Sequence, residues 1–388
     1  MPGEAADKPR VLILHNFLSP YRVPLFNALS ELVELDVWFL ADVKTIREWP
    51  SEYPDAAFRH AVLPNRTLGF GSRYDAIILN HTLPWALAAR RFDAIIVCGW
   101  AAPAMVYAGL HAWTTGTPFI VWSGSTPGEP SPVRTVSLPM VKGFVRLAQS
   151  WIAYGTRARD YLVELGAEKE KTYCAYNTVE TEWFAKESAE STEAAQTIRN
   201  TLGLGEKPLV LYCGNLLDLK GVPDLIQAFG AAASAIPDVH LVLAGSGEGQ
   251  SRYQTMCVDL GIESRVHFVG FIDRRRLPAY YAMADVLVVP SRREVWGLVI
   301  NEALACGVPV IASDAAGATA DLIEDHVNGL IVPSRNPDAI AKALRVYFTE
   351  AEVRDRLKAA ARTSVAPFTI ARAAQAFADA VAAARSSA

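Results

Sequence analysis

The chain has few cysteines, no long apolar run and no large excess of one charge, and each absence excludes a class of protein. No apolar run reaches the roughly 20 residues of a bilayer-spanning helix. A net charge of −4, without a long Lys/Arg block, gives no support for a nucleic-acid partner. The polar N-terminus is not typical of a signal peptide, so we expect a cytoplasmic protein.

Patterns of metal and dinucleotide binding are missing as well. The cysteines form no C-x-x-C pair, and no two histidines lie at ligand spacing, so we expect neither a zinc site nor a catalytic metal. A dinucleotide oxidoreductase would need G-x-G-x-x-G after the first predicted strand, and residues 15–22 do not supply it. The five scattered cysteines also form no disulfide framework: Cys98, Cys174, Cys213, Cys257 and Cys306.

Short apolar runs alternate with helical patterns throughout, which is typical of parallel α/β sheets. The 388 residues are too many for one ordinary core. A first series of predicted strands comprises 11–15, 35–40, 94–98, 118–122, 151–154 and 172–176. After a polar break, a second series comprises 209–213, 240–244, 266–269, 286–289 and 308–311. The restart predicts two Rossmann-like domains, 1–182 and 207–366, joined by a linker over 183–206 that includes a helix.

One stretch of the second half combines a helix start with two carboxylates. A helix is predicted to begin near Gly297, with Glu294 in the loop before it and Glu302 inside it. The first N–H groups of a helix lack internal acceptors and carry partial positive charge, so the amides of Gly297, Leu298 and Val299 suit a phosphate. Flanking carboxylates repel a bare phosphate but accept hydrogen bonds from sugar hydroxyls. The pattern therefore favours a sugar nucleotide.

Glu294 and Glu302, with seven residues between them, precede Gly307-Val308-Pro309. This string resembles the E-x7-E signature of retaining glycosyltransferases of family 4, which have the GT-B fold. The resemblance implies two Rossmann-like domains facing across a cleft, with a C-terminal helix at 367–388 that returns to the first domain. It also implies a retaining hexosyltransferase that uses a nucleotide-diphosphate sugar and needs no other cofactor. The absence of a D-x-D pair agrees with a metal-independent site.

The same resemblance assigns roles on the donor side. Glu302 would contact the ribose hydroxyls, and Glu294 would contact the donor sugar. The segment from Gly214 to Gly221 resembles the family's G-R-L-x-x-x-K-G turn, whose Arg and Lys hold the diphosphate. Lys220 matches, whereas Asn215 stands where the arginine is usual.

Without that arginine, either Lys220 stabilises the leaving diphosphate alone or a nearby cation, Arg292 or Arg293, contributes. The turn Gly270-Phe271-Ile272 resembles the family's V-G-x-x turn, whose backbone meets the nucleobase. Gly245, in another glycine-rich turn after a predicted strand, would line the same crevice.

The acceptor side is predicted in the first domain, at the ends of its strands. Ser19-Pro20-Tyr21-Arg22 replaces the glycines that many family members have after strand one, and resembles a P-Y-R-x-P-L-F variant of one branch. Arg22 is either an ion pair at the helix start or a phosphate or acceptor contact. Further candidates end strands or follow them: His15, Tyr21, Trp100, Trp122 and Ser123. Glu129 is a looser candidate.

The predicted acceptor is a glycan, a lipid-linked glycan or a small molecule, in cell-envelope polysaccharide or glycoconjugate synthesis. A helix near Val133, with Arg134, Lys142 and Arg146, provides sparse positive charge for peripheral membrane contact. Two other functions remain open: a nucleotide-sugar epimerase of the same fold, and a non-catalytic sugar-nucleotide binding protein.

Overall fold

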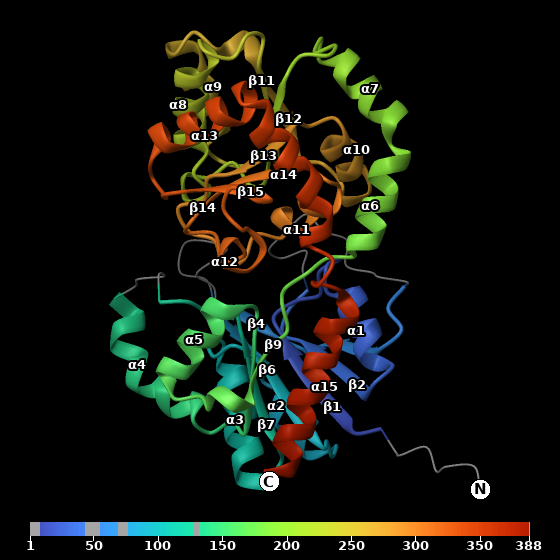
Figure 1. Ribbon diagram of the computed structural model, residues 1–388. Coiled ribbons are helices and arrows are strands. Elements are labelled where there is room, and N and C mark those ends of the chain that lie inside the picture. Colours follow the sequence, from blue (N-terminus) through green and yellow to red (C-terminus); the bar gives the residue numbers. More distant parts are fainter. Residues whose placement is uncertain (1–7, 43–54, 69–76, 128–131, 388) are drawn as a thin grey trace, which may run out of the picture. The chain divides into compact units, whose positions relative to one another are not determined.

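The computed structural model describes residues 8–42, 55–68, 77–127 and 132–387, which form two α/β units (Figure 1). Unit 1 comprises Met1–Asn177 and Ile370–Ala388, and unit 2 comprises Thr178–Thr369. Each unit is built on its own parallel sheet. The predicted α/β class with two Rossmann-like domains is therefore confirmed.

The main sheet of unit 1 has the strand order β3-β2-β1-β6-β7-β8-β9, and all its paired strands are parallel. Two further short strands, β4 and β5, pair antiparallel. The strands of unit 1 are β1 (Arg10–His15), β2 (Glu34–Phe39), β3 (Arg59–Val62), β4 (Arg66–Leu68), β5 (Ile77–Leu79), β6 (Ala94–Cys98), β7 (Phe119–Ser123), β8 (Ser150–Ala153) and β9 (Thr172–Cys174).

The helices of unit 1 include one from the far end of the chain. They are α1 (Val23–Ser30), α2 (Leu83–Ala88), α3 (Pro103–Thr115), α4 (Pro132–Val145), α5 (Thr156–Leu165) and α15 (Ile370–Ser386), with the short 3-10 helix η2 (Lys169–Lys171). Helix α15 packs against α1, β8 and β9. Its alanines allow a close approach, and Ser150 Oγ donates a hydrogen bond to the Ala380 carbonyl at 2.7 Å.

Unit 2 has the strand order β12-β11-β10-β13-β14-β15, again all parallel. Its strands are β10 (Leu209–Cys213), β11 (His240–Ala244), β12 (Val266–Gly270), β13 (Val286–Val289), β14 (Val310–Ser313) and β15 (Gly329–Val332). Its helices are α6 (Thr181–Glu190), α7 (Thr192–Thr201), α8 (Val222–Ala233), α9 (Gln250–Asp259), α10 (Leu277–Ala282), α11 (Leu298–Ala305), α12 (Thr319–Leu322), α13 (Pro337–Thr349) and α14 (Ala351–Ser364), with the 3-10 helices η3 (Asp218–Lys220), η4 (Glu263–Arg265) and η5 (Arg274–Arg276).

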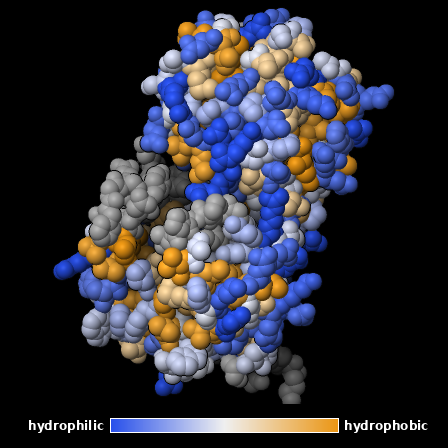
Figure 2. All heavy atoms as spheres, turned by 90° about the vertical axis from the view of Figure 1, so that its left-hand side faces the viewer, coloured by the Kyte–Doolittle hydropathy of each residue, from blue (hydrophilic) through white to orange (hydrophobic). Residues whose placement is uncertain are grey.

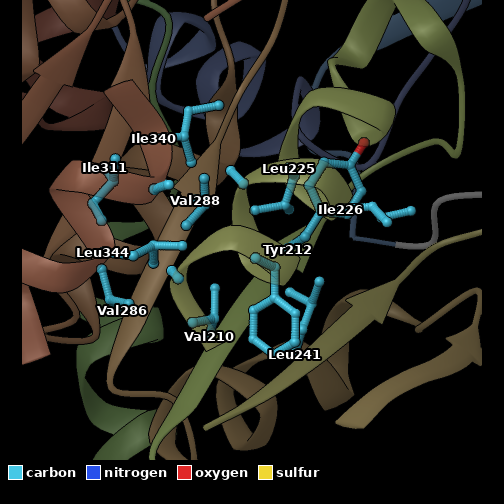
Figure 3. Close-up of a cluster of buried hydrophobic side chains, with 14 of the residues drawn as sticks. Val210, Tyr212, Leu225, Ile226, Leu241, Val286, Val288, Ile311, Ile340 and Leu344 are labelled. Carbon is cyan, nitrogen blue, oxygen red and sulfur yellow. The ribbon is translucent and has the colours of Figure 1, made fainter. Parts of the chain in front are cut away.

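The core of unit 2 forms because its central strands are apolar along their whole length, as strands covered on both faces are. Val210 and Tyr212 of β10 point to the face that α8 and α13 cover, beside Val286 and Val288 of β13 (Figure 3). Burial of these side chains holds the sheet rigid, at about 1.5–3 kcal/mol for each large apolar group. The loops at its edge therefore start from fixed points.

The stretch 183–206, predicted as a linker that includes a helix, is mostly helical and belongs to unit 2 rather than only joining the units. Helices α6 and α7 pack against α10, and α6 also packs against α11. The aromatic pair Trp183-Phe184 explains the difference, because Phe184 is fully buried and lies 6.3 Å from the Tyr281 ring. The residues around this pair are charged or small, so the sequence shows no apolar pattern that would indicate the buried face of a helix.

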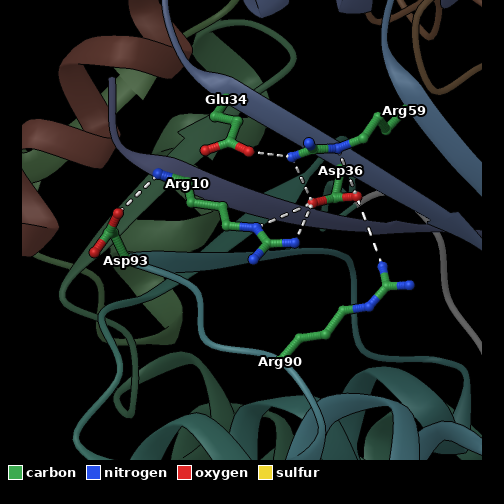
Figure 4. A network of polar contacts seen from close by, with 6 residues as sticks. All are labelled: Arg10, Glu34, Asp36, Arg59, Arg90 and Asp93. Carbon is green, nitrogen blue, oxygen red and sulfur yellow. Dashed lines mark hydrogen bonds and ion pairs between the residues drawn. The ribbon is translucent and has the colours of Figure 1, made fainter. Parts of the chain in front are cut away.

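Two further features of unit 1 are an ion-pair cluster around the buried Asp36 and a set of exposed apolar side chains. At the amino ends of its strands, Asp36 accepts from Arg10 and Arg59 and forms an ion pair with Arg90 (Figure 4). Elsewhere hydrophobic residues (orange) interrupt the hydrophilic surface (Figure 2), and Val136 of α4 is 84% exposed. Within the described ranges, no helix combines the length and apolar character that a membrane crossing requires.

Candidate nucleotide-sugar site

The strand order of unit 2 reverses between β10 and β13, its two central strands. Strand β11 lies on one side of β10, and the chain then crosses to β13 on the other side. Because all strands are parallel, the turns after β10, β11, β12 and β13 meet at one edge of the sheet. In open α/β sheets this switch point is where ligands bind. The predicted donor-side residues all lie in these turns or in α11.

Lys220 and Glu294 are brought together at this switch point. Lys220 ends η3, which follows β10, and Glu294 lies in the loop after β13. The Lys220 ammonium donates a hydrogen bond to Glu294 Oε2. The two side chains are 25% and 20% exposed, so each is largely buried but still reachable. A backbone hydrogen bond also connects these two turns: the Arg292 N–H donates to the Leu219 carbonyl at 2.9 Å.

Glu294 also lies beside the amino end of α11. A Cβ on Gly297 would lie 3.4 Å from Glu294 Cγ, and Gly297 has a φ of +99°, which favours glycine. The next residues, Leu298 and Val299, form the first turn of α11, whose N–H groups lack intrahelical acceptors. One cation, one carboxylate and a helix N-terminus therefore converge here.

Glu302 is the most deeply buried member of the predicted set. It is 1% exposed, and its Oε2 accepts a 2.6 Å hydrogen bond from the Tyr281 hydroxyl of α10. Burial raises the pKa of the Cys213 thiol, and the charge of Glu302 raises it further, which places Glu302 near the end of β10. Tyr281 fixes this carboxylate and was not among the predicted site residues.

The turns after β10, β11 and β12 are packed backbone to backbone. A Cβ on Gly245 would lie 1.8 Å from the Gly214 carbonyl oxygen, and Gly245 N–H donates to the Gly270 carbonyl at 2.8 Å. After Gly270, Phe271 is exposed whereas Ile272 is buried. Phe271 can therefore meet a ligand through its side chain, and Ile272 only through its backbone.

The position that lacks the usual arginine has an exposed side chain. Asn215 is exposed to solvent, and its backbone carbonyl accepts a 2.7 Å hydrogen bond from the Tyr212 hydroxyl. Arg292 does not replace the missing cation, because it donates two hydrogen bonds, at 2.6 and 2.7 Å, to the buried Asp224. Arg293 is exposed. Lys220 is thus the cation that the described residues of unit 2 place against Glu294.

A second ion pair next to Lys220 was not predicted. Asp218, two residues earlier, pairs with Arg252 and accepts a 2.7 Å hydrogen bond from the Tyr253 hydroxyl. These two hydrogen bonds lower the pKa of Asp218. Because Arg252 lies on α9, 32 positions downstream of Lys220, a motif search around the lysine could not find it.

On the acceptor side, His15 and Arg22 lie together at the carboxyl edge of the unit 1 sheet. His15 ends β1 and is surrounded by the rings of Phe17, Phe26, Phe39 and Trp122. Burial, with the charge of Arg22 adding to it, lowers the pKa of His15 to about 3. His15 is therefore neutral at physiological pH.

With the residues that the structure describes, Arg22 does not form the ion pair that was one of its two predicted roles. It is 9% exposed, and it donates to Asn177 Oδ1 at 2.8 Å and to the Tyr154 hydroxyl at 2.9 Å. Its guanidinium lies 4.6 Å from the centre of the Trp122 ring. In the part of the chain that the structure describes, no carboxylate pairs with it.

The remaining acceptor candidates differ in exposure. Trp122 is 1% exposed and packs against Phe377 of α15, so its ring is not a surface on which a sugar can stack. Ser123 is also buried, and its Oγ accepts from Ser125 N–H at 3.1 Å. Tyr21 and Trp100 are half-buried and remain accessible. Glu129 lies outside the described residues.

Tyr154 and Asn177 were missed, although a signal for them existed. Tyr154 directly follows β8, and Asn177 follows β9 by two residues. The rule that selected His15 and Trp122, a polar or aromatic residue at a strand end, applies to both.

Among the described residues of either unit, no cluster of three or more His, Cys, Asp or Glu side chains could hold a metal ion.

A comparison with protein families matches residues 195–364, most of unit 2, to "Glycosyl transferases group 1". Among curated relatives, a D-inositol 3-phosphate glycosyltransferase of Xylanimonas cellulosilytica is 33% identical over 53% of this chain and 50% of its own length. A GDP-mannose-dependent alpha-(1-6)-phosphatidylinositol monomannoside mannosyltransferase of Mycolicibacterium smegmatis is 35% identical, over 43% and 44%. The chain thus spans about half the length, or less, of these relatives.

Solved structures are similar over both units. The Anabaena protein Alr3699/HepE, crystallised with UDP and glucose, has a TM-score of 0.76 at 22% identity, over 96% of this chain and 99% of that one. A sucrose-phosphate synthase from Thermosynechococcus elongatus has a TM-score of 0.73 at 23% identity, over 94% and 96%. These similarities show the fold, and the family match covers the unit that carries Lys220 and Glu294. Residues 195–364 of unit 2 are therefore similar to the glycosyl transferases group 1, and the chain has the two-sheet α/β architecture of the GT-B fold.

Proposed function

We propose that the protein transfers a hexosyl group from a nucleoside-diphosphate sugar to an acceptor hydroxyl with retention of anomeric configuration, without a metal. The observation that carries this proposal is the meeting of Lys220, Glu294 and the α11 N-terminus at the switch point of the unit 2 sheet. The match to group 1 glycosyltransferases and the UDP complex of the Anabaena protein support it.

The chemistry follows from where charge develops. As the glycosidic bond to the donor breaks, the leaving diphosphate gains negative charge, which preorganised donors stabilise most strongly in a site poor in water. Lys220 and the amides of Leu298 and Val299 would supply those donors. The ammonium already lies against Glu294, so diphosphate binding would free the carboxylate to accept from a hydroxyl of the donor sugar.

Glu302 would accept from the ribose hydroxyls, held in place by Tyr281. Both carboxylates thus bind the donor, and neither needs to act as a nucleophile as in retaining hydrolases. Retention would come from attack on the same face that the diphosphate leaves, with the leaving phosphate taking the acceptor proton.

For the acceptor we propose a glycan or lipid-linked glycan of cell-envelope or glycoconjugate synthesis. Curated relatives are named for inositol phosphate and phosphatidylinositol mannoside substrates, which favours this class. We also propose peripheral membrane contact through α4, where Val136 and Met140 are exposed next to Lys142. Co-sedimentation with anionic vesicles, lost in a Val136→Glu/Met140→Glu variant, tests that contact; equal sedimentation of both proteins would refute it.

The donor site is tested by thermal shift against UDP-, GDP-, ADP- and dTDP-sugars, since a ligand that binds only the folded state raises Tm. One donor class should raise the Tm of the wild type and fail to raise that of Lys220→Ala. Lys358→Ala is the matched control, because Lys358 pairs with Asp285 just before β13, at the opposite end of the strand that precedes Glu294.

Release of nucleoside diphosphate with an acceptor then tests the reaction itself. Transfer to an acceptor supports the proposal. Epimerised free nucleotide sugar without acceptor would support an epimerase instead, and binding without any diphosphate release would support a binding protein.

A further inference from the structure

The buried arginine of unit 1, Arg22, is unusual in having only neutral partners among the described residues. Arg22 precedes α1 and contacts the side chains of Asn177, Tyr154 and Trp122, none of which carries a charge. Its charge also acts on two further described titratable groups, His15 and Cys98. Burial lowers the pKa of His15 and raises that of Cys98, so both are neutral near pH 7.

In the same sheet, arginines with a purely structural role pair with a buried carboxylate. At its amino edge, Arg10, Arg59 and Arg90 all reach the buried carboxylate of Asp36 (Figure 4). Burying a charge costs free energy unless an opposite charge and hydrogen bonds offset the cost. Arg10 at the start of β1 has that compensation, whereas Arg22, which follows the end of β1, has no opposite charge beside it in the described ranges.

Two buried polar atoms beside Arg22 also lack partners among the described residues. His15 Nδ1 lies 3.0 Å from the Phe17 carbonyl, so it carries the proton and Nε2 is an acceptor. Neither His15 Nε2 nor the Trp122 indole N–H has a hydrogen-bond partner, although the two residues are 93% and 99% buried. The two rings lie 5.4 Å apart. Orphaned buried donors and acceptors are rare, and each requires an explanation such as a catalytic role or a bound water or ion.

We propose that Arg22 binds an oxyanion, a phosphate or carboxylate group, of the glycosyl acceptor. Two of the five guanidinium N–H donors are used by Asn177 and Tyr154, which leaves others for the anion. The assignment to the acceptor rests on the proposed function, in which Lys220 and the α11 amides of unit 2 hold the diphosphate of the donor. The acceptor class is therefore an acidic sugar, polyol phosphate or lipid phosphate rather than a neutral glycan.

Inorganic phosphate is the probe, titrated into the full chain by calorimetry in a phosphate-free buffer, with and without saturating UDP. The wild type should bind phosphate equally well in both conditions. Arg22→Gln should weaken phosphate binding at least tenfold, Arg22→Lys should weaken it less, and UDP affinity should be unchanged in both. Arg10→Gln is the matched control and should keep phosphate binding.

Stability separates this role from a structural one. Without phosphate, Arg22→Gln should melt close to the wild type, because removal of a buried charge that has no carboxylate partner among the described residues offsets the loss of its hydrogen bonds to Asn177 and Tyr154. Arg10→Gln should melt lower, because it leaves Asp36 with fewer cations. A destabilised Arg22→Gln that still binds phosphate like the wild type would overturn the proposal.

The titrations with UDP show whether Arg22 binds an oxyanion of the acceptor or the diphosphate of the donor. If UDP displaces phosphate, and Arg22→Gln and Arg22→Lys both weaken UDP binding, Arg22 holds the donor diphosphate and the acceptor assignment is wrong. If no nucleotide binds at all but phosphate binding still depends on Arg22, the proposed glycosyl transfer fails while the oxyanion site stands.

Discussion

The backbone of Gly221 passes so close to Pro290 that a Cβ on the glycine would lie 1.9 Å from the Pro290 carbonyl oxygen. Gly221 follows Lys220 and has a φ of +73°, and Pro290 follows β13. This contact joins the two turns that bring Lys220 to Glu294. Gly221→Ala should therefore destabilise unit 2 by roughly 2–5 kcal/mol, from left-handed strain together with overpacking.

Gly261→Ala is the control for this variant. Gly261 has a similar φ of +64°, but a Cβ there would meet nothing within 4 Å. Its cost should be only the strain of about 1–2 kcal/mol. Urea unfolding of both variants measures the difference, and equal losses would show that the Gly221–Pro290 contact does not constrain the site.

Alanine substitutions of the two glutamates should change different quantities, donor affinity for Glu302 and kcat for Glu294. Glu302→Ala removes the buried partner of Tyr281 and the proposed ribose contact, so donor affinity should fall about tenfold or more. Glu294→Ala leaves the nucleotide contacts and should mainly depress kcat, since it removes the proposed contact to the reacting sugar. Donor Kd by calorimetry and steady-state kinetics separate the two effects.

Tyr281→Phe provides the finer test. It removes the 2.6 Å hydrogen bond to Glu302 while keeping the ring, so it should weaken donor binding less than Glu302→Ala. Unchanged kinetics in Glu302→Ala and Glu294→Ala together would refute the assignment of this site.

Much of the fold was predictable because parallel strands are continuous apolar runs bounded by glycine-rich turns. The strands at 94–98, 209–213, 240–244 and 286–289 were predicted with the bounds of β6, β10, β11 and β13. By contrast β3, whose four residues are all exposed, carries no apolar run, and it was missed. Helix was expected between the two strand series, but the packing of α6 and α7 in unit 2 was not, because their burial depends on partners far away in the chain.

The residues of the candidate site likewise fall into those that the sequence could predict and those that it could not. Lys220 and Glu294 could be selected because their spacing to glycines and to a helix start is local. The partners that fix or engage the cations could not: Asp224 is 68 positions from Arg292, and Asn177 is 155 positions from Arg22. Which carboxylate, if any, accompanies an arginine is decided by the tertiary fold.

Metal removal tests the proposed metal independence. If Lys220 and the α11 amides stabilise the leaving diphosphate, dialysis against EDTA should leave transfer activity within about twofold of the untreated protein. Lys220→Ala should lose activity in both conditions. Loss of activity with EDTA that Mg²⁺ or Mn²⁺ restores would show that a metal ion shares the task.

The buried histidine of unit 1 should make the protein sensitive to mild acid. Its pKa of about 3 in the folded state lies below the ordinary 6.5, so between these values the unfolded chain takes up a proton that the folded chain does not. Stability must then fall as pH decreases from 6.5 toward 3, by about 1.4 kcal/mol for each pH unit. Above pH 6.5, His15 contributes no pH dependence.

His15→Phe suits the surrounding aromatic rings and removes the titrating group, so its stability should fall less than that of the wild type between pH 6.5 and 4.5. Urea unfolding at each pH gives the two slopes. His240, whose pKa is lowered to about 4 chiefly by burial, acts in the same direction and stays present in both proteins, so it cancels in the comparison. Equal slopes would mean that His15 becomes protonated in the folded state, and that the pocket around Arg22 admits a second positive charge.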